Sequence, residues 1–293
     1  MSIYAQSIYY VSPHALSGGD GSLAAPFHLI HEAVEKARKD KNCTTIYLRE
    51  GKYILDKPLV LTSDDGNDLK ELVIKNYPGE KAIISSGIIL DLKWEKYRNG
   101  MMRATVKGNP VMDMLIVNGD LKSMARYPDY DKNAVRFNGT SALATAPERV
   151  KKWKHPEGGY LHAMHSHDWG DFHYRITGKN EKGELQLEGG WQNNRPMGIH
   201  NENRMVENIF EELDVPGEWY YNKEEGRLYY YSLPDEKINE LTFETPQLKN
   251  LIEFAGTLSA PVKNITIEGI ELTQTIRTFM EHYEPLLRSD WTI

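Results

Sequence analysis

The stretch HSHDWGDFHYRI, from His165 to Ile176, concentrates side chains that can bind a metal ion or a sugar. Five of the ten histidines of the chain lie between His155 and His173. Imidazoles coordinate zinc, and together with carboxylates they also hydrogen-bond to sugar hydroxyls. A tryptophan ring offers a flat apolar face of the kind that packs on a pyranose. Side chains along an extended strand alternate between its two faces, so His165, His167 and Trp169 would lie on the same face.

A zinc site requires more than the His-x-His pair in this stretch. A third protein ligand is needed, with further groups that orient the ligands, and His162 or His173 are the nearby imidazoles. The chain contains no His-Glu-x-x-His motif, so we predict no metal here. We interpret the stretch as either a sugar-facing surface or a polar network buried where a β module meets the rest of the fold. The predicted sugar-binding residues are His165, His167, Asp168, Trp169, Arg126 in MARYPD and Arg195 in QNNRPMG.

Carboxylic acids are the second group of chemical candidates. Hydrolysis of a glycosidic bond usually needs two carboxyl groups, and one of them must keep its proton near neutral pH. With 42 acidic residues, spacing alone does not identify the pair. The catalytic candidates are Glu218, which follows the Pro-Gly turn in LDVPGEWYY, Asp168 beside a tryptophan, and Glu271 in NITIEGIEL. A role in a turn, cap or salt bridge is the alternative for each.

Composition excludes several functional classes. The net charge of -7 and the short basic run at 151–154 argue against nucleic acid as a partner. No segment has the roughly 20 consecutive apolar residues that span a bilayer. Cys43 is the single cysteine, so no intrachain disulfide can form. No P-loop, G-x-S-x-G or dinucleotide motif is present, which excludes nucleotide-cofactor and α/β-hydrolase chemistry.

The elements that would position these residues are mostly β-strands. Residues 8–92 contain short strands rich in Ile, Leu and Val, separated by turns, which is typical of a solenoid. One helix is predicted near residues 27–40, because helical spacing there places five apolar residues on one face: Leu29, Ile30, Ala33, Val34 and Ala37. Residues 93–245 contain aromatic, alternating strands and predict an inserted antiparallel β module, including a hairpin in GEWYYNKEEGRLYYY. Residues 246–293 resume the solenoid.

Several motifs resemble one group of proteins. The series YYVSP, GGDGSLAAPF, EAVEKAR, TTIYLREGKYIL and LVLT resembles the entry segment of right-handed parallel β-helix proteins that act on carbohydrates. The segments LIVNGDLKSMARYP, GGWQNNRPMG, VENIFEELDVPGEWYYN and NITIEGIELTQT resemble bacterial β-helix glycoside hydrolases close to glycoside hydrolase family 141. The resemblance implies a right-handed parallel β-helix with one N-terminal capping helix and an inserted antiparallel β module.

The resemblance also implies a function. It implies a glycoside hydrolase for fucoside- or xylan-type substrates, whose catalytic acids lie on later rungs than those seen here. We therefore expect the solenoid to be truncated, the chain to be inactive alone, and its exposed C-terminal rung to favour self-association. The alternatives are a polysaccharide lyase, for which Ca²⁺ would be the cofactor, and a non-catalytic carbohydrate-binding protein. For the hydrolase we expect no cofactor, and an oligo- or polysaccharide as partner.

The N-terminal residues indicate the cellular location expected for the protein. Residues 1–7 end in Ala5-Gln6-Ser7 and resemble the remnant of a signal peptide whose basic and apolar parts precede this start. We therefore expect a secreted or periplasmic protein, with a cytoplasmic location as the alternative.

Overall fold

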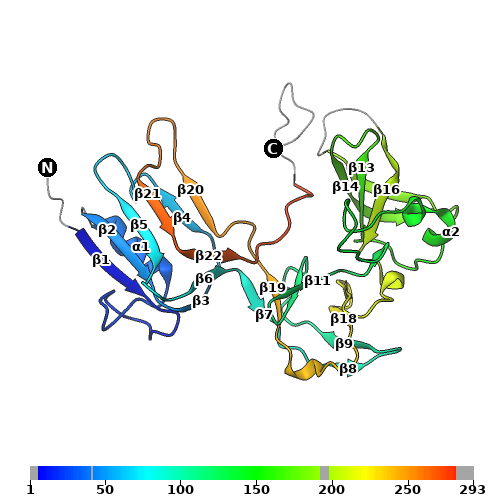
Figure 1. Ribbon diagram of the computed structural model, residues 1–293, viewed down its shortest axis with the longest axis horizontal. Helices are drawn as coiled ribbons and strands as arrows, with labels where there is room; N and C mark the ends of the chain where they lie inside the picture. Colours follow the sequence, from blue (N-terminus) through cyan, green and yellow to red (C-terminus); the bar gives the residue numbers. More distant parts are fainter. Residues whose placement is uncertain (1–5, 41, 192–197, 282–293) are drawn as a thin grey trace. The chain divides into compact units, whose positions relative to one another are not determined.

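The computed structural model describes residues 6–40, 42–191 and 198–281 of the 293-residue chain. These residues form a mostly β structure with short helices, divided into two compact units (Figure 1). The first unit comprises Met1–Ile88 and Pro246–Ile276, and the second comprises Ile89–Thr245 and Arg277–Ile293. The sequence assigned all of 246–293 to the solenoid. Arg277 instead groups with the second unit, because its guanidinium pairs with two carboxylates there.

Parallel strands build the first unit. Strands far apart in the sequence pair side by side, so that residues after 246 extend sheets begun before residue 88. The three sheets, in strand order, are β1 (Gln6–Val11), β2 (Cys43–Leu48), β5 (Leu72–Asn76) and β21 (Ile265–Glu268); β3 (Gly51–Ile54), β6 (Ala82–Ser85) and β22 (Ile270–Thr273); and β4 (Leu59–Thr62) with β20 (Ile252–Ala255).

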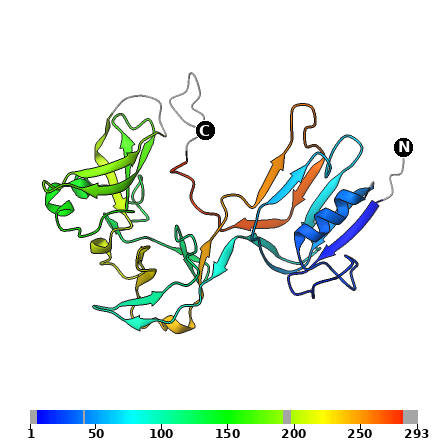
Figure 2. The same cartoon turned by 180° about the vertical axis from the view of Figure 1, so that it is seen from behind.

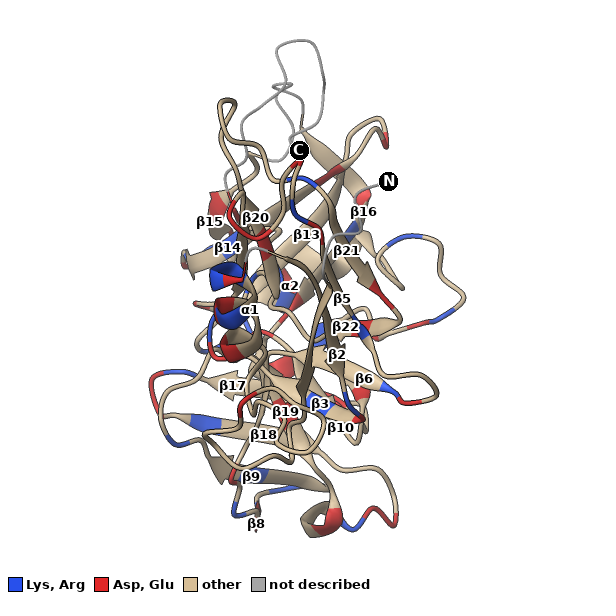
Figure 3. Ribbon diagram, turned by 90° about the vertical axis from the view of Figure 1, so that its left-hand side faces the viewer, with Lys and Arg blue, Asp and Glu red and all other residues tan. Residues whose placement is uncertain are grey.

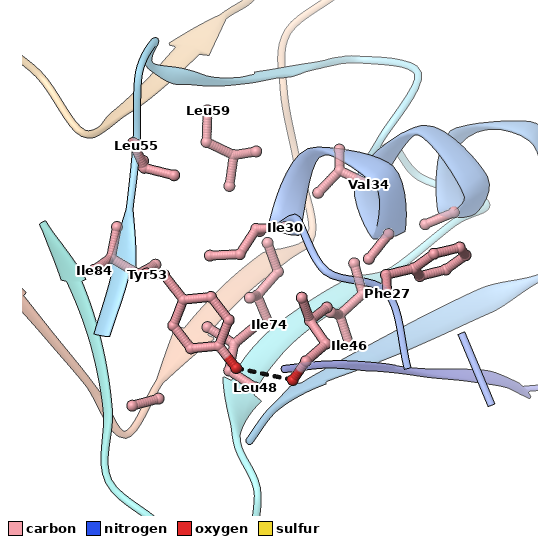
Figure 4. Close-up of a cluster of buried hydrophobic side chains, with 14 of the residues drawn as sticks. Phe27, Ile30, Val34, Ile46, Leu48, Tyr53, Leu55, Leu59, Ile74 and Ile84 are labelled. Carbon is pink, nitrogen blue, oxygen red and sulfur yellow. Dashed lines mark hydrogen bonds between the residues drawn. The ribbon is translucent and has the colours of Figure 1, made fainter. Parts of the chain in front are cut away.

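Alternation along these strands creates the core of the first unit. Every second side chain points to the same face of a strand, so each sheet contributes an apolar row. The rows meet the apolar face of the helix in one cluster, which includes Ile46, Leu48, Leu59, Leu61, Leu72, Ile74 and Ile84 (Figure 4). At its edge the Tyr53 hydroxyl donates a 2.8 Å hydrogen bond to the carbonyl oxygen of Val11, as the dashed line in Figure 4 marks.

The predicted helix forms as α1 (Ile30–Lys39), which lies beside β1 (Figure 2). Four of the five residues predicted for its apolar face are buried, namely Ile30, Ala33, Val34 and Ala37. Leu29 was predicted wrongly as part of the buried face, because it occupies the N-cap position with extended backbone. Glu32 accepts hydrogen bonds from the backbone amides of His28 and Leu29 and caps the first turn. The outer face of α1 carries charges of both signs (Figure 3).

Antiparallel strands build the second unit. Its largest sheet has the order β12 (Arg126–Tyr127), β16 (Ile199–Glu207), β13 (Tyr160–His165), β14 (Asp171–Lys179) and β15 (Leu185–Gly189). A second sheet has the order β17 (Trp219–Asn222), β18 (Arg227–Tyr231), β9 (Met101–Thr105) and β8 (Glu95–Lys96). In a third sheet β10 (Leu115–Val117) pairs antiparallel with β11 (Asp120–Lys122) on one side and with β19 (Phe243–Pro246) on the other. Strand β7 (Gly87–Ile89) lies where the chain passes from the first unit to the second. The short helices are η1 (Ala142–Thr145), α2 (Pro147–Val150), η2 (Phe210–Glu212) and η3 (Ile238–Glu240).

Two local predictions for this unit had different outcomes. The aromatic hairpin is confirmed: β17 and β18 pair antiparallel, with Trp219 opposite Tyr230. The extended strand through His165, His167 and Trp169 was wrong. Strand β13 ends at His165, and the chain then turns, with Asp168 at a φ of 57° before Gly170. A residue in the left-handed region cannot continue a strand, so alternation does not apply there.

The core of the first unit yields a stability prediction with a matched control. Leu61 is 0% exposed in β4, whereas Leu69 in the turn before β5 is 74% exposed. We expect Leu61→Ala to lower the free energy of unfolding by about 2–5 kcal/mol, because it leaves a cavity in packed apolar surroundings. Leu69→Ala should change it by less than about 0.5 kcal/mol. Urea denaturation measures both, and equal losses would contradict the packing described for this core.

Candidate functional site

A pocket of about 570 Å³ lies within the second unit and gathers most of its buried charge. Its wall combines strand ends with the loops before β12 and β17. The polar lining residues are Asp113, Lys122, Ser123, Arg126, Tyr130, Glu207, Glu218 and Arg277. The apolar lining includes Met114, Leu121, Met124, Val215 and Trp219. Concave sites with a few convergent polar groups are the usual form of ligand-binding sites.

Arg277 holds two carboxylates at the base of this pocket. Its backbone amide, Nε and Nη2 donate to the carboxylate of Asp113 over 2.7–3.1 Å. Its Nη1 donates to the Glu207 carboxylate. Burial alone lowers the pKa of Arg277, but the charges of Glu207 and Asp113 outweigh it, so the net pKa is raised. One cation therefore fixes acidic groups from two distant segments of the chain.

Glu207 is the most constrained carboxylate of the pocket. It ends β16, where its backbone is paired with Arg126 on one side and Tyr160 on the other. His162 Nε2 lies 3.1 Å from its Oε1. Burial raises the pKa of Glu207, but Arg277 and His162 have the larger combined effect, so the net pKa lies well below its usual range. Glu207 is therefore ionised at neutral pH.

His162 supports Glu207 as a neutral imidazole. Burial is the main reason that its pKa is lowered, despite the opposing effect of Glu207. A neutral ring that donates from Nε2 to the carboxylate has an acceptor at Nδ1. That Nδ1 lies 2.6 Å from Nδ1 of His173, which therefore donates to it. The two histidines thus serve to orient Glu207.

Glu218 is the carboxyl group that differs from the others. It directly precedes β17, after Gly217, whose φ of 96° favours glycine. Its side chain is buried, and neither carboxyl oxygen has a hydrogen-bond partner within the described part of the chain. Burial first, and then repulsion from Asp214, raises the pKa of Glu218 to about 8. At neutral pH this carboxyl group therefore holds its proton, and Glu218 is one of the residues that line the pocket.

Strand pairing brings Arg126 close to Glu218. Trp219 binds the segment before β12 through three hydrogen bonds: its amide donates to Ser123, its indole donates to Lys122, and its carbonyl accepts from Ala125. Arg126 follows directly in β12 and is 4% exposed. Its Nε donates to the carbonyl of Pro128, and its Nη2 donates to the carbonyls of Phe137 and Gly139. Burial lowers the pKa of this guanidinium, and the charges of Glu207 and Glu218 oppose the shift.

Among the described residues, two of those singled out from the sequence line the pocket. Glu218 and Arg126, which were predicted in different roles, line the same pocket. Asp168 lies elsewhere, in ion pair and hydrogen bond with Arg136 and Asn203. Glu271 belongs to the first unit, where it pairs with Lys81 at 2.8 Å. Arg195 lies outside the described residues.

The remaining predicted sugar-binding residues form a cluster of rings away from the pocket lining. The indole of Trp169 stacks on the His165 imidazole, with centroids 5.8 Å apart and planes 5° apart. His167 packs at an angle to both rings. His165 is buried, and its Nε2 has no hydrogen-bond partner in the part of the chain that the structure describes. Trp169 is 47% exposed, so part of its ring remains accessible.

The sequence did not single out Asp113, Glu207 or Arg277. Glu207 lies in the segment VENIFEELDVPGEWYYN but nothing in that pattern marks it, and the three residues are separated by long stretches of chain. The guanidinium of Arg277 brings the two carboxylates together. In the described ranges no three His, Cys, Asp or Glu side chains gather so that they could hold a metal ion. No described helix is long and apolar enough to cross a bilayer.

Comparison with known proteins supports a fold. No protein-family model matches the chain, and no curated protein matches it in sequence. A solved structure described as a glycoside hydrolase matches with a TM-score of 0.74 and 23% identity, over 92% of this chain and 51% of the other. The chain thus has a glycoside hydrolase-like fold and spans about half the length of that protein. The complex structure of XylC with xylose matches at a TM-score of 0.42, with 14% identity over 92% of this chain and 35% of the other, which is too low to establish a shared fold.

The raised pKa of Glu218 yields a pH-dependent stability prediction. The folded pKa of about 8 exceeds the ordinary value of 4.5. Between these two pH values the folded chain keeps a proton that the unfolded chain has lost, so this group makes stability fall as pH rises through that window. Glu218→Gln removes the effect, and we expect it to stabilise the protein at pH 8 by up to about 5 kcal/mol, with little gain at pH 4.5.

Urea denaturation at several pH values from 4.5 to 9 measures this difference. The control is Glu271→Gln, because Glu271 is exposed and its ion pair should contribute less than about 1 kcal/mol. An identical pH slope in the wild type and in Glu218→Gln would contradict a protonated, buried Glu218.

Proposed function

We propose that this chain is part of a glycoside hydrolase and that its second unit binds the glycan in the Glu218 pocket. The observation that carries the proposal is a buried carboxylic acid in the pocket lining, whose oxygens have no hydrogen-bond partner among the described residues. The glycoside hydrolase-like fold of the chain supports a sugar as the ligand. A protonated carboxyl can donate to a sugar hydroxyl or to the oxygen between two sugars.

The pocket supplies one half of a two-carboxylate mechanism. Glu218 has the raised pKa that a general acid needs. The second group must be an ionised carboxylate that is available to a water molecule or to the sugar carbon. Asp113 and Glu207 both pair with Arg277, which occupies their carboxylate oxygens, and the pKa of Glu207 lies below its usual range. We therefore propose that residues 1–293 bind a glycan without turning it over, and that the second carboxylate lies in the remainder of a longer protein.

The parallel sheets of the first unit support a finer proposal for the fold. In all three sheets a strand from residues 252–273 pairs in parallel with a strand from residues 59–85. Successive parallel strands that surround one apolar interior are the arrangement expected of a β-helix. We propose that these sheets are turns of a right-handed parallel β-helix and that the substrate is of fucoside or xylan type. A secreted or periplasmic location suits such a polymer.

Binding and turnover test this function separately. Purified 1–293 should bind fucosylated oligosaccharides or xylo-oligosaccharides in calorimetry, and it should release no product from aryl fucosides, aryl xylosides or xylan. Glu218→Gln keeps the shape and a donor group, so binding at neutral pH should change by less than about threefold. Steady hydrolysis that Glu218→Gln abolishes would place the whole active site in this chain. Absence of binding to either class would contradict the proposed function.

Trp169 is proposed as a second sugar-contacting surface outside the pocket. Because its ring is 47% exposed and stacked on His165, the exposed part can pack on a pyranose. Trp169→Ala should weaken oligosaccharide binding several-fold while the melting temperature falls by only a few degrees. Trp153→Ala is the matched control for a core tryptophan, since Trp153 is 1% exposed, and it should cost about 3–5 kcal/mol. A comparable stability loss for Trp169→Ala would exclude the binding role.

A further inference from the structure

A row of contacts leads from the base of the pocket to the surface of the second unit. Glu207 ends β16 and lines the pocket, and His162 Nε2 lies 3.1 Å from its Oε1. Strand register places His162 opposite His173, and the Nδ1 atoms of the two rings are 2.6 Å apart. Beyond them, His173 Nε2 lies 3.5 Å from Oδ2 of Asp171, whose side chain is 46% exposed. Three contacts therefore connect a buried carboxylate with an exposed one through two imidazoles.

These three contacts need more protons than two neutral imidazoles carry. Each contact is a hydrogen bond only if a proton lies between its two atoms, and an ionised carboxylate supplies none. Asp171 is ionised at neutral pH, because its hydrogen bond with His173 lowers its pKa. Glu207 is ionised too, because Arg277 and His162 outweigh its burial. A neutral imidazole has one N–H, so two neutral rings satisfy two contacts and leave a nitrogen lone pair against a carboxylate in the third.

We propose that His162 and His173 together hold one extra proton near neutral pH, and that this proton makes the pair a pH-sensitive link between Asp171 and Glu207. With the extra proton the pair has three N–H groups for its three contacts. The positive charge resides on His173, because its side chain is 14% exposed and lies next to Asp171, whereas that of His162 is 5% exposed. Burial also lowers the pKa of His162, which keeps that ring neutral. The link needs no ligand, so it is independent of the proposed function.

Loss of the extra proton breaks the link at its outer end. Glu207 keeps its hydrogen bond with His162, because that contact is the shorter one and Arg277 also holds the carboxylate in place. His173 still donates from Nδ1 to His162, so its Nε2 becomes an acceptor that faces Asp171. A carboxylate repels an acceptor, so the His173 ring turns away from Asp171 as the pH rises.

The segment 277–281 responds to this movement because it packs on the pair. The ring centroid of Phe279 lies 5.0 Å from that of His162 and 4.9 Å from that of His173. Arg277, two residues earlier, contributes the cation that binds Glu207. A change in the orientation of His173 therefore reaches the segment that supplies Arg277 to the pocket, and this segment loosens when the extra proton is lost.

The charged and titratable groups around the pair come from every neighbouring element. Besides the two carboxylates of the row they are Tyr160 on β13, Arg175 on β14, Glu188 opposite it on β15, and Arg277 with its partner Asp113. Burial raises the pKa of Tyr160, and in Arg277 the charges of its partners outweigh burial, so its pKa is raised as well. Imidazole is the side chain that ordinarily titrates between about pH 5 and 8. Glu218 has a pKa of about 8, so the tests use Glu218→Gln as the parent chain.

Nitrogen NMR of residues 1–293 with isotope-labelled histidine counts the protons on each ring. At pH 6 we expect His162 to be protonated only at Nε2 and His173 at both nitrogens, and at pH 9 we expect the pair to carry one proton fewer. His162→Gln and His173→Gln assign the signals. Asp171→Asn removes the anionic partner of the charged ring, so it should move the midpoint of this titration down by about 0.5 pH unit or more. Any other protonation pattern at pH 6, or an unmoved midpoint in Asp171→Asn, would overturn the proposal.

Amide hydrogen exchange tests whether the pair acts on the segment 277–281. The backbone amide of Arg277 donates to the carboxylate of Asp113, and that of Glu281 donates to the carbonyl of Thr278, so both amides report on this segment. After correction for the intrinsic effect of pH, their exchange in the parent chain should become about threefold faster or more between pH 6 and 9.

Variants of the pair separate this effect from a general loss of stability. In His173→Gln, which cannot titrate, the corrected exchange should change by less than about 1.5-fold over the same range. Asp171→Asn serves if the glutamine variant does not fold, and its increase in exchange should begin at a lower pH than in the parent. His14→Gln, at an exposed histidine of the first unit, is the control and should follow the parent. Exchange that stays constant in the parent, or that rises equally in His173→Gln, would show that the proton does not act on this segment and would overturn the switch.

Discussion

The ion pairs of Arg277 are the interaction on which the candidate site depends. A single guanidinium binds Asp113, in the segment before β10, and Glu207, at the end of β16. Carboxylates out of water are costly unless they are paired, so the Arg277 cation stabilises the approach of these two segments. The position of Arg277 explains why it groups with the antiparallel unit although the residues just before it belong to the parallel one.

Around this fixed centre the pocket contains carboxyl groups in opposite protonation states. Glu207 is surrounded by a cation and a neutral imidazole, which stabilise its ionised form. Glu218 has burial and a neighbouring acid around it, which stabilise its protonated form. The difference is one of environment, since both residues are glutamates that line the same pocket. An arrangement that separates the pKa values of two acids is typical of sites that transfer or donate protons.

The two units differ in where their apolar and charged side chains lie. Parallel sheets and α1 enclose an apolar core in the first unit, where no buried charge of comparable extent occurs among the described residues. The second unit carries the pocket and the exposed ring of Trp169. Antiparallel sheets place loops and strand ends at one edge, which allows polar groups from several segments to converge, whereas the alternation of the parallel strands serves mainly to fill an interior.

The sequence by itself determined the strands of the first unit, the apolar face of α1 except Leu29, and the hairpin of β17 and β18, because periodicity and turn residues are local signals. It also singled out Glu218 and Arg126, but not as neighbours. Tertiary structure alone decided that they share a pocket with Asp113, Glu207 and Arg277, and that the histidine-rich stretch turns after His165 instead of continuing as a strand. The physical reason is that burial and charge pairing arise from strand register between distant segments, which no local pattern of residues encodes.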